Sequence, residues 1–271
     1  MLGIVLSRRD FRETDQIISL YSLEKGKKEA LARGVKKITS KNSGSLEPFS
    51  IVEVEIIPGK EIDRIGSVQT IELFKNIRAD FNKMVLAQRA VSLVEQLFSN
   101  SEPDAPSFNI FFSWLQNLNQ SPSASPVLLD TLVIKLLACL GFAPELNHCG
   151  VCGRSYLPLT KGERGWGLPS PALPRVYYFN IAAGGLICPE CQEKSLSSEQ
   201  LLPLTPTTLQ ALRTIMAADW KPIFSLTLDK KEAGALHKLV YRFGVFHSGK
   251  KLKEWHNQDE LSTPRTIDRK K

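Results

Sequence analysis

The sequence predicts an α+β multidomain protein, in which a small N-terminal β-barrel is followed by an α-helical domain with an inserted four-cysteine module. Five short strand-like runs separated by turn residues fill about the first 75 residues. Five strands favour an OB-type barrel, although an SH3-like barrel fits the count nearly as well. Apolar residues then recur at helical spacing from residue 80 onward. Two CxxC pairs interrupt the helical part.

The barrel strands are expected over residues 2–6, 16–21, 28–34, 49–57 and 62–73. The fourth run shows the clearest pattern, because Val52, Val54 and Ile56 alternate with Glu53 and Glu55. Successive side chains of a strand point to opposite faces, so this alternation predicts one buried and one exposed face.

Helices are expected over 80–98, 108–118, 128–140, from 205 onward and over 229–249. In the first of these, the side chains expected on the buried side are Phe81, Val85, Val91, Val94, Leu97 and Phe98. The second contains Phe108, Phe111, Phe112, Trp114 and Leu115, which could stack on bases, but their helical spacing favours a core. The third is apolar on nearly all sides, which predicts a central helix with Cys139 buried.

Helix ends are marked by capping residues. Thr205 followed by Pro206 predicts an N-cap with proline at the first helical position. Asp229 with Glu232 predicts a capping box for the last helix, and Gly249 lies where a C-cap belongs.

The four thiols of Cys149, Cys152, Cys188 and Cys191 can converge on one tetrahedral centre, and thiolate ligands favour Zn²⁺. The 35 residues between the pairs exceed the usual spacing of about 15–20. A hairpin can fill this insert, and residues 165–167 and 176–185 are expected to form one. Four ligands close the site, which favours one structural zinc ion over a catalytic one, and a redox or disulfide pair is the alternative. His148 is expected beside the site or at the surface.

Composition and charge limit the class of protein. The chain has 271 residues, 42% of them hydrophobic, and a net charge of +7, which suits an anionic partner. Charged residues interrupt the only early apolar stretch, so no signal peptide is expected. The longest apolar run, 127–140, is too short to cross a bilayer and contains Asp130 and Lys135. We expect a soluble protein of a reducing compartment, which places it in the cytoplasm.

Positive charge is concentrated between residues 25 and 41, where seven basic residues accompany one acidic residue. The candidate DNA-binding residues are Lys25, Lys27, Lys28, Arg33, Lys36, Lys37 and Lys41. A charge run by itself is more often a solvated loop without a ligand, but its place on an OB-type barrel favours nucleic acid. A second basic region, 230–271, contains 11 basic and 5 acidic residues and could hold DNA or keep a frayed tail soluble.

Several pieces of the sequence together resemble a known family. They are Arg9-Asp10-Phe11-Arg12-Glu13-Thr14-Asp15, Gly26-Lys27, Ala32-Arg33-Gly34-Val35-Lys36-Lys37 and Leu46-Glu47-Pro48-Phe49. In this order and spacing they resemble the opening of the bacterial recombination mediator RecO family, in its zinc-containing form. The resemblance extends over the whole chain and is strongest in residues 1–75 and at the four cysteines.

The resemblance implies an OB fold, a helical domain and an inserted zinc module. It also implies a mediator of recombinational repair that binds single- and double-stranded DNA and anneals complementary strands. Such a protein acts with RecR, captures the acidic C-terminal tail of single-strand-binding protein, and helps RecA load onto the coated strand. No membrane partner is implied, and the expected place of action is the nucleoid.

The expected domains are 1–78 for the barrel, 79–148 with 195–250 for the helical domain, 149–194 for the zinc module and 251–271 for a basic tail. No phosphate loop, GxSxG or HExxH motif is present, and the four histidines pair with no obvious acid cluster, so no enzyme is expected. His237 is expected at the surface. Two alternatives remain: a zinc-dependent nuclease or hydrolase, and a zinc-ribbon protein-interaction module.

Overall fold

The computed structural model describes residues 1–40, 42–98, 102–156, 176–194, 200–252 and 255. The chain divides into two compact units, one of residues 1–129 with 252–271 and one of residues 130–251. Helix α4 (Val127–Cys139) crosses the division.

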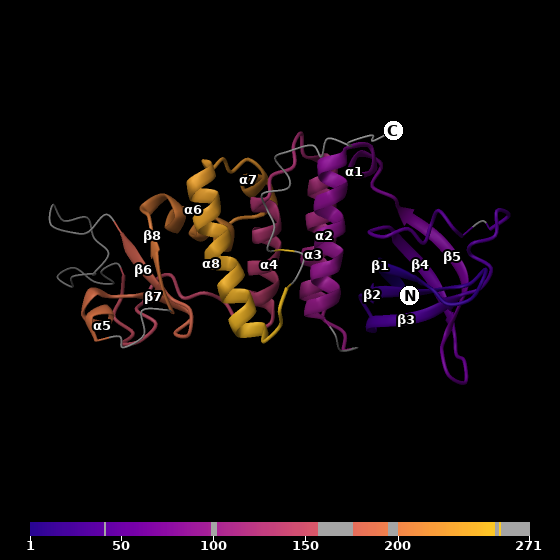
Figure 1. Ribbon diagram of the computed structural model, residues 1–271, viewed down its shortest axis with the longest axis horizontal. Coiled ribbons are helices and arrows are strands. Elements are labelled where there is room, and N and C mark those ends of the chain that lie inside the picture. The colour runs from indigo at the N-terminus through magenta and orange to yellow at the C-terminus, as the bar shows by residue number, and fades with distance from the viewer. Residues whose placement is uncertain (41, 99–101, 157–175, 195–199, 253–254, 256–271) are drawn as a thin grey trace, which may run out of the picture. The chain divides into compact units, whose positions relative to one another are not determined.

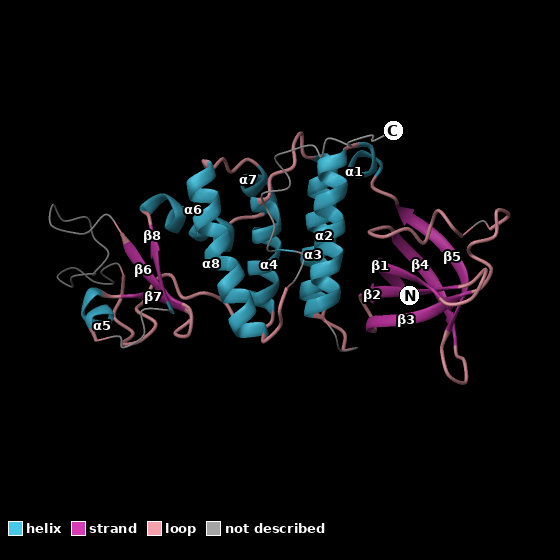
Figure 2. Ribbon diagram, viewed as in Figure 1, coloured by secondary structure: helices cyan, strands magenta, loops and turns pink. Residues whose placement is uncertain are grey.

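The first unit contains a closed barrel with the strand order β1-β2-β3-β5-β4. Its strands are β1 (Leu2–Asp10), β2 (Gln16–Ser22), β3 (Gly26–Ala32), β4 (Ile51–Ile57) and β5 (Arg64–Glu72). Strand β3 pairs in parallel with β5 through Leu31 and Arg64, whereas the other pairs are antiparallel. Figures 1 and 2 show the curved strands of this barrel. The prediction of an N-terminal OB-type barrel is confirmed.

Alternation along the strands builds the barrel core. Val52 and Val54 are buried while Glu53 and Glu55 are exposed, as the pattern predicted. Val5, Ile18 and Leu20 from the first two strands are also fully or almost fully buried in the same cluster.

The segment before β4 is fixed by an unusual backbone at Phe49, which has a left-handed φ of 58°. This conformation is unfavourable for a residue with a Cβ, so its surroundings must hold it. The Phe49 N–H donates to the Val5 carbonyl over 2.7 Å, and the Arg78 guanidinium lies 4.2 Å above the Phe49 ring. Arg78 also donates to the Pro48 carbonyl, which closes this end of the barrel.

Three helices follow the barrel: α1 (Lys75–Ala79), α2 (Phe81–Leu97) and α3 (Ala105–Gln120). Asp80 and Asp104 cap α2 and α3 by accepting from backbone N–H groups three residues later. Helix α3 begins earlier than predicted, because Pro106 fits in a first turn whose N–H groups have no helical partner. The prediction that Phe81 is buried was wrong: it is the first residue of α2 and is 71% exposed.

Aromatic side chains hold the helices against the barrel. The Tyr21 ring of β2 lies 5.0 Å from the ring of Phe98 and 5.9 Å from that of Phe108, centroid to centroid. Phe108, Phe111 and Trp114 are almost completely buried, and the Trp114 indole N–H donates to the Leu128 carbonyl over 2.8 Å. The aromatic residues of α3 therefore form a core, as their spacing predicted, and are not a platform for bases.

The second unit combines a small sheet with helices. The sheet has the order β7-β6-β8 and consists of β6 (Tyr177–Asn180), β7 (Gly185–Ile187) and β8 (Leu201–Leu204). Its helices beyond α4 are α5 (Pro189–Glu193), α6 (Pro206–Ala217), α7 (Trp220–Phe224) and α8 (Lys230–Ser248). The hairpin expected after Val176 is present as β6 and β7, whereas residues 165–167 lie outside the described residues. Strand β8 was not expected.

The caps of the second unit match the sequence with one exception. Thr205 caps α6 with Pro206 in its first turn, and Gly249 ends α8 with a left-handed φ of 65°. Asp229 accepts from the Glu232 N–H over 2.8 Å, but the Glu232 carboxylate accepts from the hydroxyls of Thr205 and Thr208. The predicted capping box is therefore only half formed, because the carboxylate joins α8 to α6 instead.

Expectations about two single residues and about the start of the C-terminal segment were wrong. Cys139 is exposed, at the last residue of α4, where the apolar run ends. His237 is mostly buried, and its Nδ1 lies 2.8 Å from Oδ1 of the fully buried Asp130. The region after α8 is not a solvated tail from its start, because Leu252 and Trp255 are fully buried. Most of the predicted tail 251–271 lies outside the described residues. No helix of the described residues is long and apolar enough to cross a membrane.

Replacing Phe108 by Ala should destabilise the first unit by about 3–5 kcal/mol, because a large buried ring is removed and a cavity remains. The matched control is Phe81→Ala, which should change the free energy of unfolding by less than about 0.5 kcal/mol, since that ring is exposed. Urea unfolding followed by tryptophan fluorescence measures both. Equal stability of the two variants would contradict the core assignment.

Candidate functional site

Four cysteine side chains converge in the second unit. The sulfur atoms of Cys149, Cys152, Cys188 and Cys191 all lie within 4.8 Å of one another. The Sγ atoms of Cys152 and Cys188 are 3.7 Å apart, which is too long for a disulfide of about 2.05 Å. In a tetrahedral site with metal–sulfur bonds of about 2.3 Å, neighbouring sulfurs lie about 3.8 Å apart. The cluster therefore fits a tetrahedral four-thiolate metal site.

Glycines make the first pair of cysteines a tight turn. Gly153 has a φ of +71° and donates its N–H to the Cys149 carbonyl over 2.8 Å. At Gly150 a Cβ atom would lie 2.9 Å from the Ala183 carbonyl oxygen, so a side chain there would push the turn away from the β6–β7 connection. The second pair opens α5, where the Cys191 N–H donates to the Cys188 carbonyl.

The four thiols do not ionise with equal ease. Burial opposes ionisation of Cys149, but N–H groups of Cys152, Cys188 and Val151 outweigh it and lower its pKa to about 7. Burial, together with the neighbouring thiols, raises the pKa of Cys191 to about 12. Without a cation the site therefore accommodates a first thiolate but resists the last one, and a divalent ion would relieve this repulsion.

An ion pair joins the two cysteine pairs. The Arg154 guanidinium donates to the Glu190 carboxylate through two bonds of 2.7 and 2.8 Å. This geometry is the bidentate one that holds both side chains in a fixed orientation. His148 lies apart from the sulfur cluster, with its Nδ1 3.4 Å from Oε1 of Glu145, as expected for a residue beside the site.

The candidate DNA-binding residues divide between the two ends of β3. Lys25, Lys27 and Lys28 lie at its start, whereas Arg33, Lys36 and Lys37 follow its end. A strand rises about 3.3 Å per residue, so the two groups are about 20 Å apart. Lys41 lies outside the described residues. A run of charge that is continuous in the sequence therefore becomes two separate groups on the barrel.

Acidic residues offset the charge of the first group. Lys27 lies 3.7 Å from the Glu95 carboxylate and donates to the Glu95 carbonyl. Lys27 and Lys28 also line a polar cavity of about 430 Å³ whose other lining residues are Glu29, Glu61, Ile62 and Asp63. Three carboxyl groups facing two lysines make this end a poor attractor of phosphate.

The second group is more accessible to an anion. Within the described part of the chain, no carboxylate lies within ion-pair distance of Arg33 or Lys37. Lys36 donates to Asp10 over 2.8 Å, but both side chains are exposed and such pairs are weak, so a phosphate can replace the carboxylate. Exposed Arg12, in the β1–β2 connection, likewise lacks an ion pair there. The sequence did not indicate Arg12 as a DNA-binding candidate, because it lies thirteen residues before the start of the charge run.

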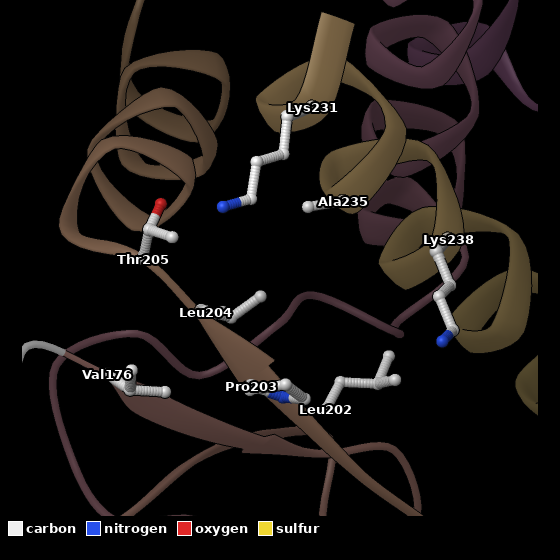
Figure 3. Close-up of a pocket in the computed structure, with 8 residues that line it drawn as sticks. All are labelled: Val176, Leu202, Pro203, Leu204, Thr205, Lys231, Ala235 and Lys238. Carbon is white, nitrogen blue, oxygen red and sulfur yellow. The ribbon is translucent and has the colours of Figure 1, made fainter.

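A third feature is an apolar cavity of about 280 Å³ in the second unit (Figure 3). Strand β8 supplies Leu202, Pro203 and Leu204, and Ala235 of α8 faces them. Lys231 and Lys238 of α8 place their ammonium groups at its edge, as Figure 3 shows. The cavity therefore combines an apolar interior with two cations.

The structure thus combines an OB-type barrel, helices and a four-cysteine cluster. Residues 1–74 match the family description "Recombination protein O N terminal", and residues 78–256 match "Recombination protein O C terminal". The chain belongs to the RecO family.

Curated relatives agree with this assignment. The DNA repair protein RecO of Desulforamulus reducens is 27% identical over 259 residues, which cover 96% of this chain and 93% of the relative. The DNA repair protein RecO of Dehalococcoides mccartyi strain BAV1 is 31% identical over 230 residues, or 84% and 82% of the two chains. That of Lactiplantibacillus plantarum is 28% identical over 263 residues, or 96% and 93%. The family supports a role in DNA repair and recombination.

Replacing Cys152 or Cys188 by Ser should lower the metal content and the midpoint of thermal unfolding together, because a closed metal site contributes folding energy directly. Elemental analysis and calorimetry of the purified chain measure the two quantities. Cys139→Ser is the matched control and should leave both unchanged, since Cys139 lies outside the sulfur cluster. A native protein without metal, or one that keeps its full stability after chelation, would contradict the prediction.

Proposed function

We propose that this protein is a DNA-binding recombination mediator of double-strand break and gap repair, in a RecF-type pathway. It anneals complementary strands and, with RecR, helps RecA load onto single-stranded DNA coated by single-strand-binding protein. It acts in the cytoplasm, at the nucleoid. Membership of the RecO family supports the role in repair and recombination. The observation that carries the proposal is the group of exposed cations, Arg12, Arg33, Lys36 and Lys37, at one end of an OB-type barrel.

The mechanism needs no bond chemistry. Two DNA strands repel each other through their phosphates, and cations that contact both backbones reduce this repulsion. Binding releases counterions from each strand, which supplies most of the affinity and is independent of sequence. The connections β1–β2 and β4–β5 of OB barrels commonly bind oligonucleotides, and Arg12 lies in the first of these.

The four-cysteine site has a structural role in this proposal, with Zn²⁺ as its ion. Cys149, Cys152, Cys188 and Cys191 would hold it, and the bound ion supplies cross-linking of the two cysteine pairs. Four protein ligands leave no open position for a water molecule. This closed ligand set argues against the alternative of a zinc-dependent nuclease, which needs one.

Changing Arg33, Lys36 and Lys37 together to Ala should flatten the dependence of log affinity on log salt by roughly 2, because each lost phosphate contact removes about 0.7 on single strands. Strand annealing should fall with the affinity. A salt titration of oligonucleotide binding measures the slope.

The matched control changes Lys75, Lys194 and Lys221 to Ala, which removes the same charge from exposed positions elsewhere. Its slope should stay close to that of the wild type. If the first triple variant keeps the wild-type slope, the DNA site lies elsewhere, and the basic C-terminal region becomes the candidate.

The cavity between β8 and α8 is the proposed site for the acidic tail of single-strand-binding protein. A tail that ends in Phe needs an apolar hole for its ring and cations for its carboxylates. A cavity of roughly 150 Å³ is enough for benzene, so the 280 Å³ cavity is large enough for that ring. Lys231 and Lys238 at the edge supply the charge (Figure 3).

Replacing Lys231 and Lys238 by Ala should weaken binding of a fluorescent acidic tail peptide and leave DNA binding unchanged. Ala235→Phe should weaken the peptide as well, because the new ring fills the cavity from α8. Lys194 and Lys221 changed to Ala serve as the control of equal charge. Loss of peptide and DNA binding together in a folded Lys231/Lys238 variant would contradict separate surfaces.

A further inference from the structure

Phe11 is a large apolar side chain that the fold leaves in water. It lies in the connection between β1 and β2 and is 45% exposed. Single exposed apolar residues are common and need no explanation by themselves. The surroundings of Phe11, however, distinguish it from the other exposed phenylalanines.

The backbone around Phe11 is fixed. The N–H groups of Phe11 and Arg12 both donate to the Asp15 carbonyl, over 3.1 and 3.4 Å, which makes residues 11–15 a tight turn. The Asp15 carboxylate accepts from the Gly34 N–H over 2.8 Å, and this bond lowers the pKa of Asp15. The Lys36 N–H donates to the Thr14 carbonyl over 3.1 Å. Two backbone segments, 11–15 and 33–40, are therefore tied together, and we call them the paired loops.

The paired loops carry one cation over the Phe11 ring and further cations in the neighbouring loop. The Arg12 guanidinium carbon lies 5.2 Å from the ring centroid, within the range of a cation–π contact. The Lys36 ammonium donates a hydrogen bond to the carboxylate of Asp10, the residue before Phe11. Arg33 and Lys37 belong to the second of the paired loops and are exposed. Ile38 of the same loop is fully exposed and adds a further apolar side chain.

Other exposed phenylalanines lack this combination. Phe81 is 71% exposed on α2, and Phe246 is 50% exposed on α8 with its ring edge-on to His247. Among the described residues, Phe11 is the exposed phenylalanine that has an arginine over its ring. An exposed aromatic ring on an ordered turn, beside cations, has the chemistry that binds single-stranded nucleic acid, in which bases stack and phosphates are neutralised.

We propose that Phe11 is a base-stacking residue: a base of single-stranded DNA stacks on its ring while Arg12 and the cations of the second loop contact the adjacent phosphates. This inference rests on the proposed DNA-binding function and adds an apolar contribution to it. Stacking requires an accessible base face, so it distinguishes single strands from duplex, whereas the cations do not.

The first test compares Phe11→Ala with Phe81→Ala in the full-length chain, using an oligonucleotide of mixed sequence. Loss of stacking should weaken single-strand binding by roughly 5- to 150-fold. The slope of log affinity against log salt should stay unchanged, because no phosphate contact is lost. Duplex binding by Phe11→Ala, and both affinities of Phe81→Ala, should equal those of the wild type.

The second test keeps a side chain at position 11 and changes its chemistry. Phe11→Leu retains apolar bulk without an aromatic face, so it should lose nearly as much single-strand affinity as Phe11→Ala. Phe11→Trp keeps an aromatic face, so it should bind single strands as tightly as the wild type. The fluorescence that the new Trp adds, measured against the wild type, should be quenched by single strands and not by duplex.

The inference is overturned if Phe11→Ala binds single strands like the wild type, if it loses duplex affinity equally, or if Phe11→Leu is unimpaired. These outcomes are distinct from failure of the proposed function. If the proposed function fails, the wild-type chain itself will bind neither single strands nor duplex in a salt-dependent manner.

Discussion

The convergence of four sulfur atoms is the constraint on which the cysteine-containing part of the second unit most depends. The apolar cluster around them is small, consisting of Cys149, Ile187 and Cys188 with a few half-buried neighbours. Small cores of this kind rarely supply enough burial to hold a fold without a cross-link or a metal. The raised pKa of Cys191 shows that the cluster resists carrying four thiolates. A bound cation would remove this resistance and stabilise the cluster. Arg213 of α6 connects this part of the chain to the helices, because its guanidinium carbon lies 4.1 Å from the centroid of the Tyr156 ring.

Local signals in the sequence predicted much of the fold. Alternation in β4, proline and glycine at the ends of α6 and α8, and helical spacing in α3 all correspond to interactions between near neighbours. Pairings between distant segments could not be predicted this way. Neither the parallel contact of β3 with β5 nor the addition of β8 to the sheet has a local signature. The partner of Glu232 was also missed, because a carboxylate that can cap its own helix can equally accept from Thr205.

The candidate sites were predicted unevenly for a related reason. The cysteine pairs could be found because ligand chemistry demands close spacing within each pair, whereas the insert between the pairs needs only to be long enough for them to meet. The positive charges were less predictable, because a strand separates Lys25 from Arg33 and acidic residues from elsewhere in the barrel neutralise one group. The nearness of Arg12 to the other group depends on the Asp15–Gly34 bond, which joins two loops nineteen residues apart.

Strand β8 is part of both the small sheet and the wall of the apolar cavity. It pairs with β6 along the full length of both strands, and its residues Leu202 to Leu204 also form one wall of the apolar cavity. If the proposed metal ion orders the sheet, it also orders this wall of the cavity. Because coupling free energies are reciprocal, a ligand in the cavity must raise the affinity for the metal by the same factor by which the metal raises the affinity for that ligand.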